Sequence, residues 1–278
     1  MSGEPRACVI GWPVGHSRSP IIHRFWLKEL GLAGDYVPVA VAPDEITAFL
    51  QDIPNNGFCG GNVTVPHKEA AFDAVDEMEP AAVAIGAVNT LWIEEGKLYG
   101  DNTDSMGFLA NLDMAVNSWD KNPGAAVVLG AGGAARAVLH ALVHRGFGPV
   151  HLVNRTLARA GALAERFGAA VRPAPWDAVE HLLHGASLLV NTTTLGMKGS
   201  PWPGLDLARL PDDAVVTDLV YVPLETPLLA AARARGLTAV DGLGMLLHQA
   251  VPGFERWFGR RPVVSPALRA EILRTFEA

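Results

Sequence analysis

The chain has 278 residues, of which 49% are hydrophobic and 18% are charged. This composition excludes disorder over most of the length and supplies a core for one large domain or two of ordinary size. A formal net charge of −7 disfavours nucleic acid and anionic membrane surfaces as partners, although an anionic small molecule still suits a local cationic pocket.

The N-terminal stretch MSGEPRACVIGW lacks the long apolar run of a signal peptide. Apolar stretches elsewhere are interrupted by Gly, Arg or His before they reach membrane-spanning length. The two cysteines, Cys8 and Cys59, lie in strand-like surroundings and show neither metal nor redox spacing. We therefore expect a cytoplasmic protein with no membrane partner, whose cysteines are small buried residues in a reducing compartment.

The first part of the chain alternates short apolar runs with helical patterns. Ser19 and Pro20 are typical of the N-cap and first residue of a helix, and Gly31 is typical of its end. Pro66 ends an apolar run and suits the first turn of another helix. Such alternation predicts a largely parallel sheet covered on both faces. The expected strands cover 7–11, 35–42 and 62–65, and the expected helices cover 19–30, 44–50 and the residues after 66.

The pattern changes after residue 87, where two strand-like runs flank the turn sequence EEGK and predict a hairpin over 88–100. A helical pattern over 104–116 and the turn-rich NSWDKNPG then indicate a hinge between two domains. A second α/β series follows. Its strands are expected over 125–129, 150–153, 187–191, 214–218 and 237–241, with helices between them and a final helix over 266–276.

A glycine loop lies in the stretch AAVVLGAGGAARAVLHALV. Gly130 permits a tight turn, Gly132 lets a pyrophosphate approach the backbone, and Ala135 keeps helix and strand close. The helix that follows offers free N–H groups and the positive end of its dipole. Two alternatives stay open at this point: a tight turn without a ligand, and a methyltransferase loop that binds a sulfonium nucleoside.

The residues after the next expected strand distinguish the two nicotinamide dinucleotides. An NAD site usually has an acidic residue there, but VHLVNRTLARA supplies Asn154, Arg155, Thr156 and Arg159 instead. Guanidinium groups and a hydroxyl suit a phosphorylated ribose. The stretch therefore favours NADP, with an ordinary helix cap and exposed arginines as the alternative.

Polar residues gather at the expected strand ends of the first half. Lys68 and Asp104 form a possible proton-transfer pair, and small neutral side chains around them suit a polyhydroxylated ligand. Each residue also has a simpler explanation, because Asn and Ser populate turns and a first-turn lysine is often solvated. His67 either orients Lys68 or fills the helix start, and no histidine spacing indicates a metal. The neutral residues of this group are Ser17, Ser19, Asn62, Thr64, Asn89 and Thr103.

Taken together, these stretches resemble the shikimate dehydrogenase family over almost the whole chain. The resemblance is carried by VIGWPVGHSRSP, NVTVPHK, GAVNT, GDNTD, GAGGAARA, NRT, NTTTLGM and DGLGMLLHQA, which occur in the order of the family pattern. One departure is visible, because Ser105 stands where the family usually has glycine. Since this position merely begins a helix, we expect serine to be accepted there.

The resemblance implies roles for individual residues. Lys68 and Asp104 would be the catalytic pair, and Ser17 and Ser19 would bind the carboxylate side of the substrate. The rest of the substrate pocket would be formed by Asn62, Thr64, Asn89, Asp104, Tyr221 and Gln249. The pyrophosphate would lie against Gly130, Ala131, Gly132, Gly133, Ala134 and Ala135, and the adenosine phosphate against Asn154, Arg155, Thr156 and Arg159. The nicotinamide side would contact Thr192, Met197, Val220, Tyr221, Gly242 and Met245.

The resemblance also implies an α/β fold with an N-terminal substrate domain over 1–103, a Rossmann NADP-binding domain over 104–241, and C-terminal helices over 242–278 that return to the first domain. The implied enzyme interconverts 3-dehydroshikimate and shikimate with NADP(H) in aromatic amino-acid biosynthesis, as a monomer or homodimer. Two alternatives remain: a relative that prefers quinate or an amino-substituted analogue, and a catalytically idle NADPH-binding regulator. The idle regulator is disfavoured because both Lys68 and Asp104 are present.

Overall fold

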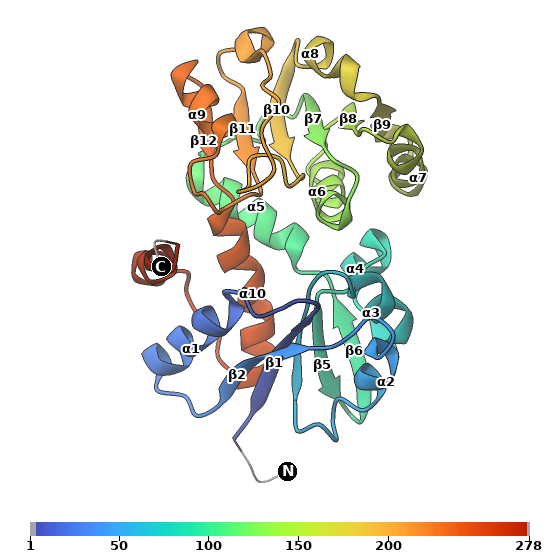
Figure 1. Ribbon diagram of the computed structural model, residues 1–278, viewed down its shortest axis with the longest axis vertical. Coiled ribbons are helices and arrows are strands. Elements are labelled where there is room, and N and C mark those ends of the chain that lie inside the picture. The colour runs from blue at the N-terminus through green and yellow to red at the C-terminus, as the bar shows by residue number, and fades with distance from the viewer. Residues whose placement is uncertain (1–3, 277–278) are drawn as a thin grey trace. The chain divides into compact units, whose positions relative to one another are not determined.

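The computed structural model describes residues 4–276. The chain forms two compact units. The first unit comprises Met1–Asp104 and Leu247–Ala278, and the second comprises Ser105–Leu246. The first unit therefore contains the blue, cyan and red segments of Figure 1, and the second contains the green to orange segments.

The first unit is built on a six-stranded sheet with the order β2-β1-β3-β5-β6-β4. Only β5 runs against its neighbours, because it forms the first half of the expected hairpin. The hairpin turns at Glu95 and Gly96, which have φ angles of 51° and 80°. The short β4 was not expected from the sequence. The strands are β1 (Arg6–Gly11), β2 (Asp35–Ala40), β3 (Gly60–Val63), β4 (Glu77–Met78), β5 (Thr90–Glu94) and β6 (Lys97–Asp101).

The helices of the first unit confirm the expected alternation but shift two boundaries. Arg18, not Ser19, is the N-cap residue of α1, and the Ser19 N–H donates to Ser17 Oγ at 3.3 Å. Pro66 lies before the next helix rather than in its first turn, since β3 ends at Val63 and a turn precedes Lys68. The helices are α1 (Ser19–Leu30), α2 (Ile46–Gln51), α3 (Lys68–Ala74) and α4 (Pro80–Ile85), the last of which was not expected.

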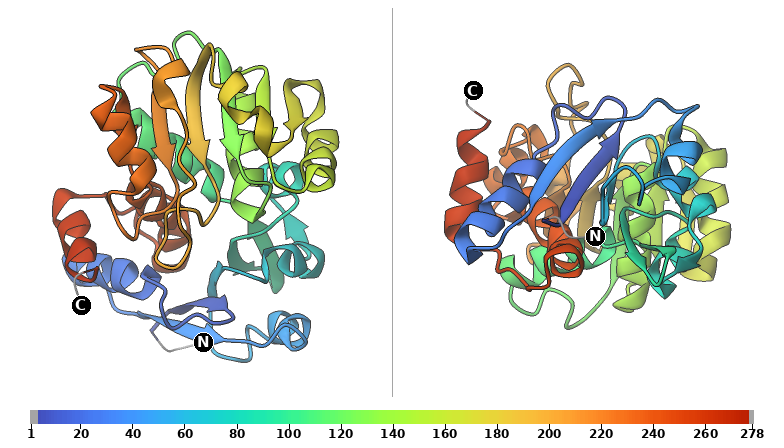
Figure 2. Two further views of the ribbon diagram at one scale, coloured as in Figure 1. Left: turned by 45° about the horizontal axis from the view of Figure 1, so that its top comes forward. Right: turned by 90° about the horizontal axis from the view of Figure 1, so that it is seen from below.

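C-terminal segments complete the first unit. Helix α10 (Leu243–Phe258) begins in the second unit and continues into the first, and α11 (Pro266–Arg274) follows it. Figures 1 and 2 show α11 beside α1, although the two helices are far apart in the sequence. Their neighbourhood is fixed by polar contacts as well: Trp26 Nε1 donates to the Val263 carbonyl at 3.0 Å, and Arg18 donates to the Thr275 carbonyl at 3.0 Å.

The second unit is a six-stranded sheet with the order β12-β11-β10-β7-β8-β9, and every pair is parallel. This order reverses direction on either side of β7, which creates a crevice at the carboxyl ends of the strands where such sheets bind ligands. The strands are β7 (Ala125–Leu129), β8 (Val150–Val153), β9 (Val171–Ala174), β10 (Ala186–Asn191), β11 (Val215–Asp218) and β12 (Thr238–Val240).

Alternating side chains of these strands pack into two cores. Ala126 and Val128 face a core shared with three helices, while Val127 and Leu129 face the opposite core. The first core is covered by α5 (Asp104–Ala115), α6 (Gly133–His144) and α7 (Leu157–Phe167), and the second by α8 (Val179–Leu182) and α9 (Pro227–Ala234). Across residues 4–276, no helix is both long and apolar enough to cross a membrane.

Candidate active site

Lys68 and Asp104 form an ion pair in the first unit. Lys68 begins α3 and Asp104 begins α5, and Lys68 Nζ donates to Asp104 Oδ2. Their side chains are only 22% and 11% exposed, so water screens the pair less than it would on the surface. Among the described residues Lys68 Nζ has no other partner. An ammonium group has three N–H donors, so two remain for the oxygen of a ligand.

Asn89 holds the Asp104 side of this pair. Its Nδ2 donates to Asp104 Oδ1 at 2.8 Å and reaches Gln249 Oε1 at 3.5 Å. Its Oδ1 accepts from the Thr103 N–H at 2.8 Å and from Thr90 Oγ1 at 2.9 Å. Because all its hydrogen-bonding groups are used within the protein, Asn89 fixes the Asp104 carboxylate and has little left for a ligand.

Asn62 is the next member of the network, and Tyr36 sets its orientation. The Tyr36 hydroxyl donates to Asn62 Oδ1 at 2.7 Å, and Asn62 Nδ2 donates to the Asn89 carbonyl and to Thr90 Oγ1, both at 3.1 Å. Both amide hydrogens are therefore used, and Oδ1, which accepts from Tyr36, has the capacity to accept one more hydrogen bond. Sequence reasoning missed Tyr36, because an aromatic residue in a strand is typical of the core.

Several other expected residues are not joined to this network. Within residues 4–276, no hydrogen bond connects the hydroxyls of Ser17 or Thr64 with Lys68, Asn89 or Asp104. Gln249 is joined to it: its carbonyl accepts from Thr103 Oγ1 at 2.8 Å. The idea that His67 orients Lys68 gains no support, because the buried His67 ring bonds to the Val41 carbonyl through Nε2 at 2.8 Å.

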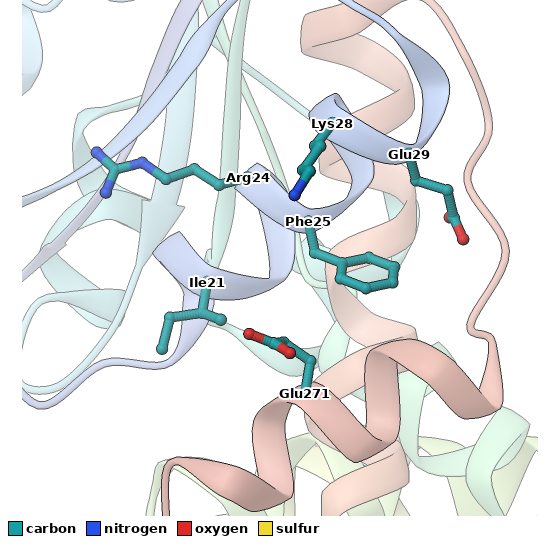
Figure 3. Close-up of a pocket in the computed structure, with 6 residues that line it drawn as sticks. All are labelled: Ile21, Arg24, Phe25, Lys28, Glu29 and Glu271. Atoms are coloured by element: carbon teal, nitrogen blue, oxygen red, sulfur yellow. The ribbon is translucent and has the colours of Figure 1, made fainter.

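Figure 3 shows a different pocket of the first unit, with a volume of about 560 Å³. It lies along the outer face of α1 and includes none of the expected substrate residues. Two of its charged groups are already paired, Arg24 with Asp35 at 2.9 Å and Glu271 with Arg274. The polar network around Lys68 is therefore the better candidate for catalysis. The pocket is lined by Ile21, Arg24, Phe25, Lys28, Glu29 and Glu271.

The glycine loop of the second unit has the geometry of an anion cradle. Gly130 has a φ of 99°, and an added Cβ would lie 2.7 Å from Thr193 Cγ2, so only glycine fits. Gly132 is the N-cap residue of α6 and supplies no side-chain cap, so no side chain within residues 4–276 caps the first N–H groups of the helix. Gly132 and Gly133 are exposed and open space lies where a Cβ would be, so a pyrophosphate fits against this backbone.

The stretch after β8 lies next to this loop. Asn154 Oδ1 accepts from the Ala131 N–H at 3.3 Å, and Asn154 Nδ2 donates to the Thr156 carbonyl at 2.9 Å. Arg155 and Arg159 are exposed, and neither forms an ion pair with a carboxylate among the described residues. Asn154 thus ties the two segments together, while the two guanidinium groups remain available for a phosphate.

The residues expected on the nicotinamide side all belong to the second unit and follow its strands β10, β11 and β12. Thr192 Oγ1 donates to the Leu129 carbonyl at 2.7 Å, so its hydroxyl binds the end of β7, the strand that leads into the glycine loop. Met197 is 42% exposed, whereas Val220 is buried. These loops lie at the carboxyl ends of parallel strands, which is the edge where a dinucleotide binds.

A glycine loop at the switch point of a parallel sheet and, in the other unit, a shielded lysine–carboxylate pair are typical of nicotinamide-dinucleotide oxidoreductases. Comparison with known families narrows this class. Residues 9–91 match the shikimate dehydrogenase substrate binding domain, residues 114–196 match shikimate / quinate 5-dehydrogenase, and residues 242–270 match the shikimate 5'-dehydrogenase C-terminal domain. The chain belongs to the shikimate dehydrogenase family.

Individual relatives agree with this assignment. The chain is 59% identical over 273 residues to the shikimate dehydrogenase (NADP(+)) of Azorhizobium caulinodans, covering 98% of this chain and 97% of the relative. It is 40% identical to the shikimate 5-dehydrogenase of Thermus thermophilus, solved with NADP(H) and shikimate, with a TM-score of 0.85 and coverage of 98% and 99%. The quinate dehydrogenase of Corynebacterium glutamicum, solved with NAD, is 32% identical with a TM-score of 0.89 and coverage of 98% and 99%.

Proposed function

We propose that this chain is an NADP-dependent shikimate dehydrogenase that interconverts 3-dehydroshikimate and shikimate, a reaction of aromatic amino-acid biosynthesis. The observation that carries the proposal is the Lys68–Asp104 pair, held by Asn89 and only partly open to water. The names of close relatives point to the same substrate and cofactor. The first unit would bind the substrate and the second the cofactor.

The proposed chemistry divides between cofactor and protein. When bound, the nicotinamide ring supplies or accepts the hydride. During reduction, negative charge develops on the carbonyl oxygen of the substrate, and the two free N–H groups of Lys68 stabilise that charge and donate the proton. Asp104 orients the Lys68 ammonium group through the bond to its Oδ2. Oxidation of the alcohol is the reverse: Lys68 Nζ, in the neutral form that reduction leaves behind, would accept the hydroxyl proton as the hydride leaves.

Recognition of the substrate would use the remaining expected residues. The free lone pair of Asn62 Oδ1 calls for a hydroxyl donor, which a polyhydroxylated ring provides. Ser17 and Ser19 would bind the carboxylate side, with further contacts from Thr64, Tyr221 and Gln249. Small neutral groups of this kind orient a ligand without competing with the charged pair for its proton.

Residues of the second unit would bind the dinucleotide and determine the preference for NADP over NAD. Gly130, Gly132 and the first turn of α6 would bind the pyrophosphate, with Ala131, Gly133, Ala134 and Ala135 alongside them. Arg155 and Arg159 favour the phosphorylated ribose of NADP, together with Asn154 and Thr156. The nicotinamide side would be lined by Thr192, Met197, Val220, Tyr221, Gly242 and Met245.

A second candidate is a quinate-preferring enzyme, since the quinate dehydrogenase of Corynebacterium glutamicum has a very similar fold. An absorbance assay of NADP⁺ and NAD⁺ reduction with shikimate, quinate and an amino-substituted analogue separates the two. We expect the highest kcat/KM with shikimate and NADP⁺. A higher value with quinate would select the second candidate. No turnover of any of them, with NADPH still bound, would instead indicate a regulator.

A further inference from the structure

A buried polar pair in the second unit has no role in the chemistry described above. Asn191 ends β10 and Asp218 ends β11, and they are partners in the register of these parallel strands. Both residues are 0% exposed, and Asn191 Nδ2 donates to Asp218 Oδ1 at 2.8 Å. A carboxylate this deeply buried needs several donors to offset its lost hydration, so its partners show what it holds in place.

The Asp218 carboxylate ties three segments together. Besides Asn191, its Oδ1 accepts from the Val220 N–H at 3.0 Å, and its Oδ2 accepts from Thr226 Oγ1 at 2.7 Å. Burial raises the pKa of Asp218, while its three hydrogen bonds act in the opposite direction. Thr226 is the N-cap residue of α9. Oδ2 therefore binds the start of this helix, while Oδ1 binds the loop after β11.

Asn191 in turn shapes the loop after β10. Its Oδ1 accepts from the Thr193 N–H at 3.0 Å and from Thr193 Oγ1 at 2.7 Å, and its Nδ2 also donates to the Leu195 carbonyl at 3.1 Å. Thr193 Oγ1 then accepts from the Leu195 N–H at 3.0 Å. These bonds close a compact turn, which fixes the path of the chain between Asn191 and Met197.

The segments held in this way carry residues that we assign to the nicotinamide side. Thr192 and Met197 follow Asn191, and Val220 and Tyr221 follow Asp218. Gly242 approaches the same backbone so closely that an added Cβ would lie 2.6 Å from the Asp218 carbonyl oxygen. We propose that Asn191 and Asp218 are positioning residues that hold these loops in the geometry required for hydride transfer, an inference that rests on the proposed function.

The two sides of the Asp218 carboxylate allow a matched test. Asn191→Ala and Asp218→Ala remove bonds that hold the loops. Thr226→Val removes the bond to Oδ2 and the cap of α9 but leaves both Oδ1 bonds in place, so it lowers stability without loosening the loops. Asp218→Asn retains an oxygen acceptor for Val220 and serves as the conservative variant.

Three measurements separate positioning from stability. These are kcat with shikimate and NADP⁺, the isotope effect on kcat with shikimate deuterated at the oxidised carbon, and the emission of bound NADPH, all below the Tm of every variant. Because small displacements of reacting groups are costly, we expect Asn191→Ala and Asp218→Ala to lower kcat about 10- to 100-fold. Their isotope effect should rise and their NADPH emission should move toward that of free NADPH. Asp218→Asn should recover most of the loss, and Thr226→Val should retain kcat at a lowered Tm.

Two results would overturn the inference. One is a folded Asn191→Ala protein with the kcat, isotope effect and NADPH emission of the unchanged chain; this variant decides the matter alone if Asp218→Ala does not fold. The other is a Thr226→Val protein that loses as much kcat as Asn191→Ala at the same Tm. If the unchanged chain fails to oxidise shikimate, the proposed function fails, and the NADPH emission of the variants still decides whether the pair positions the loops.

Discussion

The polar network of the first unit and the glycine loop of the second are built in opposite ways. Around Lys68, side chains from distant segments bind one another, so Asn62, Asn89 and Asp104 are oriented before any ligand arrives. In the glycine loop, the first backbone N–H groups of α6 have no side-chain cap. A network of mutually bound side chains suits catalysis, which needs fixed geometry, while free donors suit the binding of an anion.

Removing Lys68 should produce the largest effect. Its two free N–H groups would stabilise charge that develops only during hydride transfer, so the loss should fall on turnover more than on binding. We expect Lys68→Ala to lower kcat about 10²- to 10⁴-fold, as for other positioned acid–base groups. Steady-state kinetics, with folding checked by circular dichroism, would measure it.

A matched control is Lys97→Ala. Lys97 also pairs with a carboxylate in the first unit, Glu77 at 2.8 Å, but both side chains are about half exposed. Exposed pairs contribute little, so this variant should keep its kcat. A folded Lys68→Ala enzyme with nearly normal kcat would refute the catalytic role.

The pair should also act as one functional group. Asp104→Asn keeps the acceptor for Asn89 Nδ2 but loses the charge that orients Lys68, so we expect a fall in kcat of similar size. The kcat of the double variant should then be little lower than that of the less active single variant, because the effects of coupled residues are not additive. Independent losses that multiply would contradict a shared role for Lys68 and Asp104.

The sequence predicted the fold more fully than the polar network. Gly130, Gly132 and the alternating strands of the second unit follow local rules, and the structure confirms the strand–helix order there. The sequence missed β4, β9 and α4, which are short segments without a strong period, and it placed the N-cap of α1 one residue late. Local patterns fix elements well when those elements are long or end at a glycine with a positive φ, as at Gly31.

The contacts that orient the network could not be predicted, because they join residues far apart in the chain. Tyr36 reaches Asn62, and Gln249 reaches Thr103, and neither link has a local signature. Asn191 and Asp218 had a usable signal, since two polar residues end neighbouring parallel strands. Polar residues at adjacent strand ends in an apolar sheet therefore merit examination as a pair, not only as loop residues.

Arg155 tests the cofactor loops of the second unit, where an exposed side chain can be removed without disturbing its neighbours. Its exposed guanidinium would bind the ribose phosphate, so Arg155→Ala should weaken NADP⁺ binding by roughly 1.5–3 kcal/mol and leave NAD⁺ nearly unchanged. Kinetics and binding with both dinucleotides would measure the difference.

Arg172→Ala is the matched control for Arg155→Ala. Arg172 is also exposed in the second unit, and it pairs in register with His151, away from the carboxyl end of β8. The same charge is therefore removed without a change in cofactor preference. Equal losses for NADP⁺ and NAD⁺ in Arg155→Ala would show that this residue does not contact the phosphate.

The smallest expected effect is on stability, and it concerns the aromatic residues that pack against the first-unit network. His23 is 0% exposed and stacks on Tyr36 with ring centroids 4.0 Å apart, and neither ring nitrogen has a hydrogen-bond partner among the described residues. Burial lowers the pKa of His23 to about 3 from an ordinary value of 6.5. Between these two values the unfolded chain binds a proton here that the folded chain does not, so stability falls as the pH falls through this window.

Replacing His23 with phenylalanine removes this titration and retains the stacking on Tyr36. In the unchanged chain the residue should cost about 1.4 kcal/mol of unfolding free energy for each pH unit below 6.5. His23→Phe should therefore show a shallower loss of stability between pH 6.5 and 5 in urea titrations. Hydrogen exchange in α1 and β2, which carry His23 and Tyr36, should be faster at pH 5 than at pH 6.5, and the variant should reduce that difference. Equal pH slopes for the two proteins would show that His23 is not the group that makes the first unit acid-sensitive.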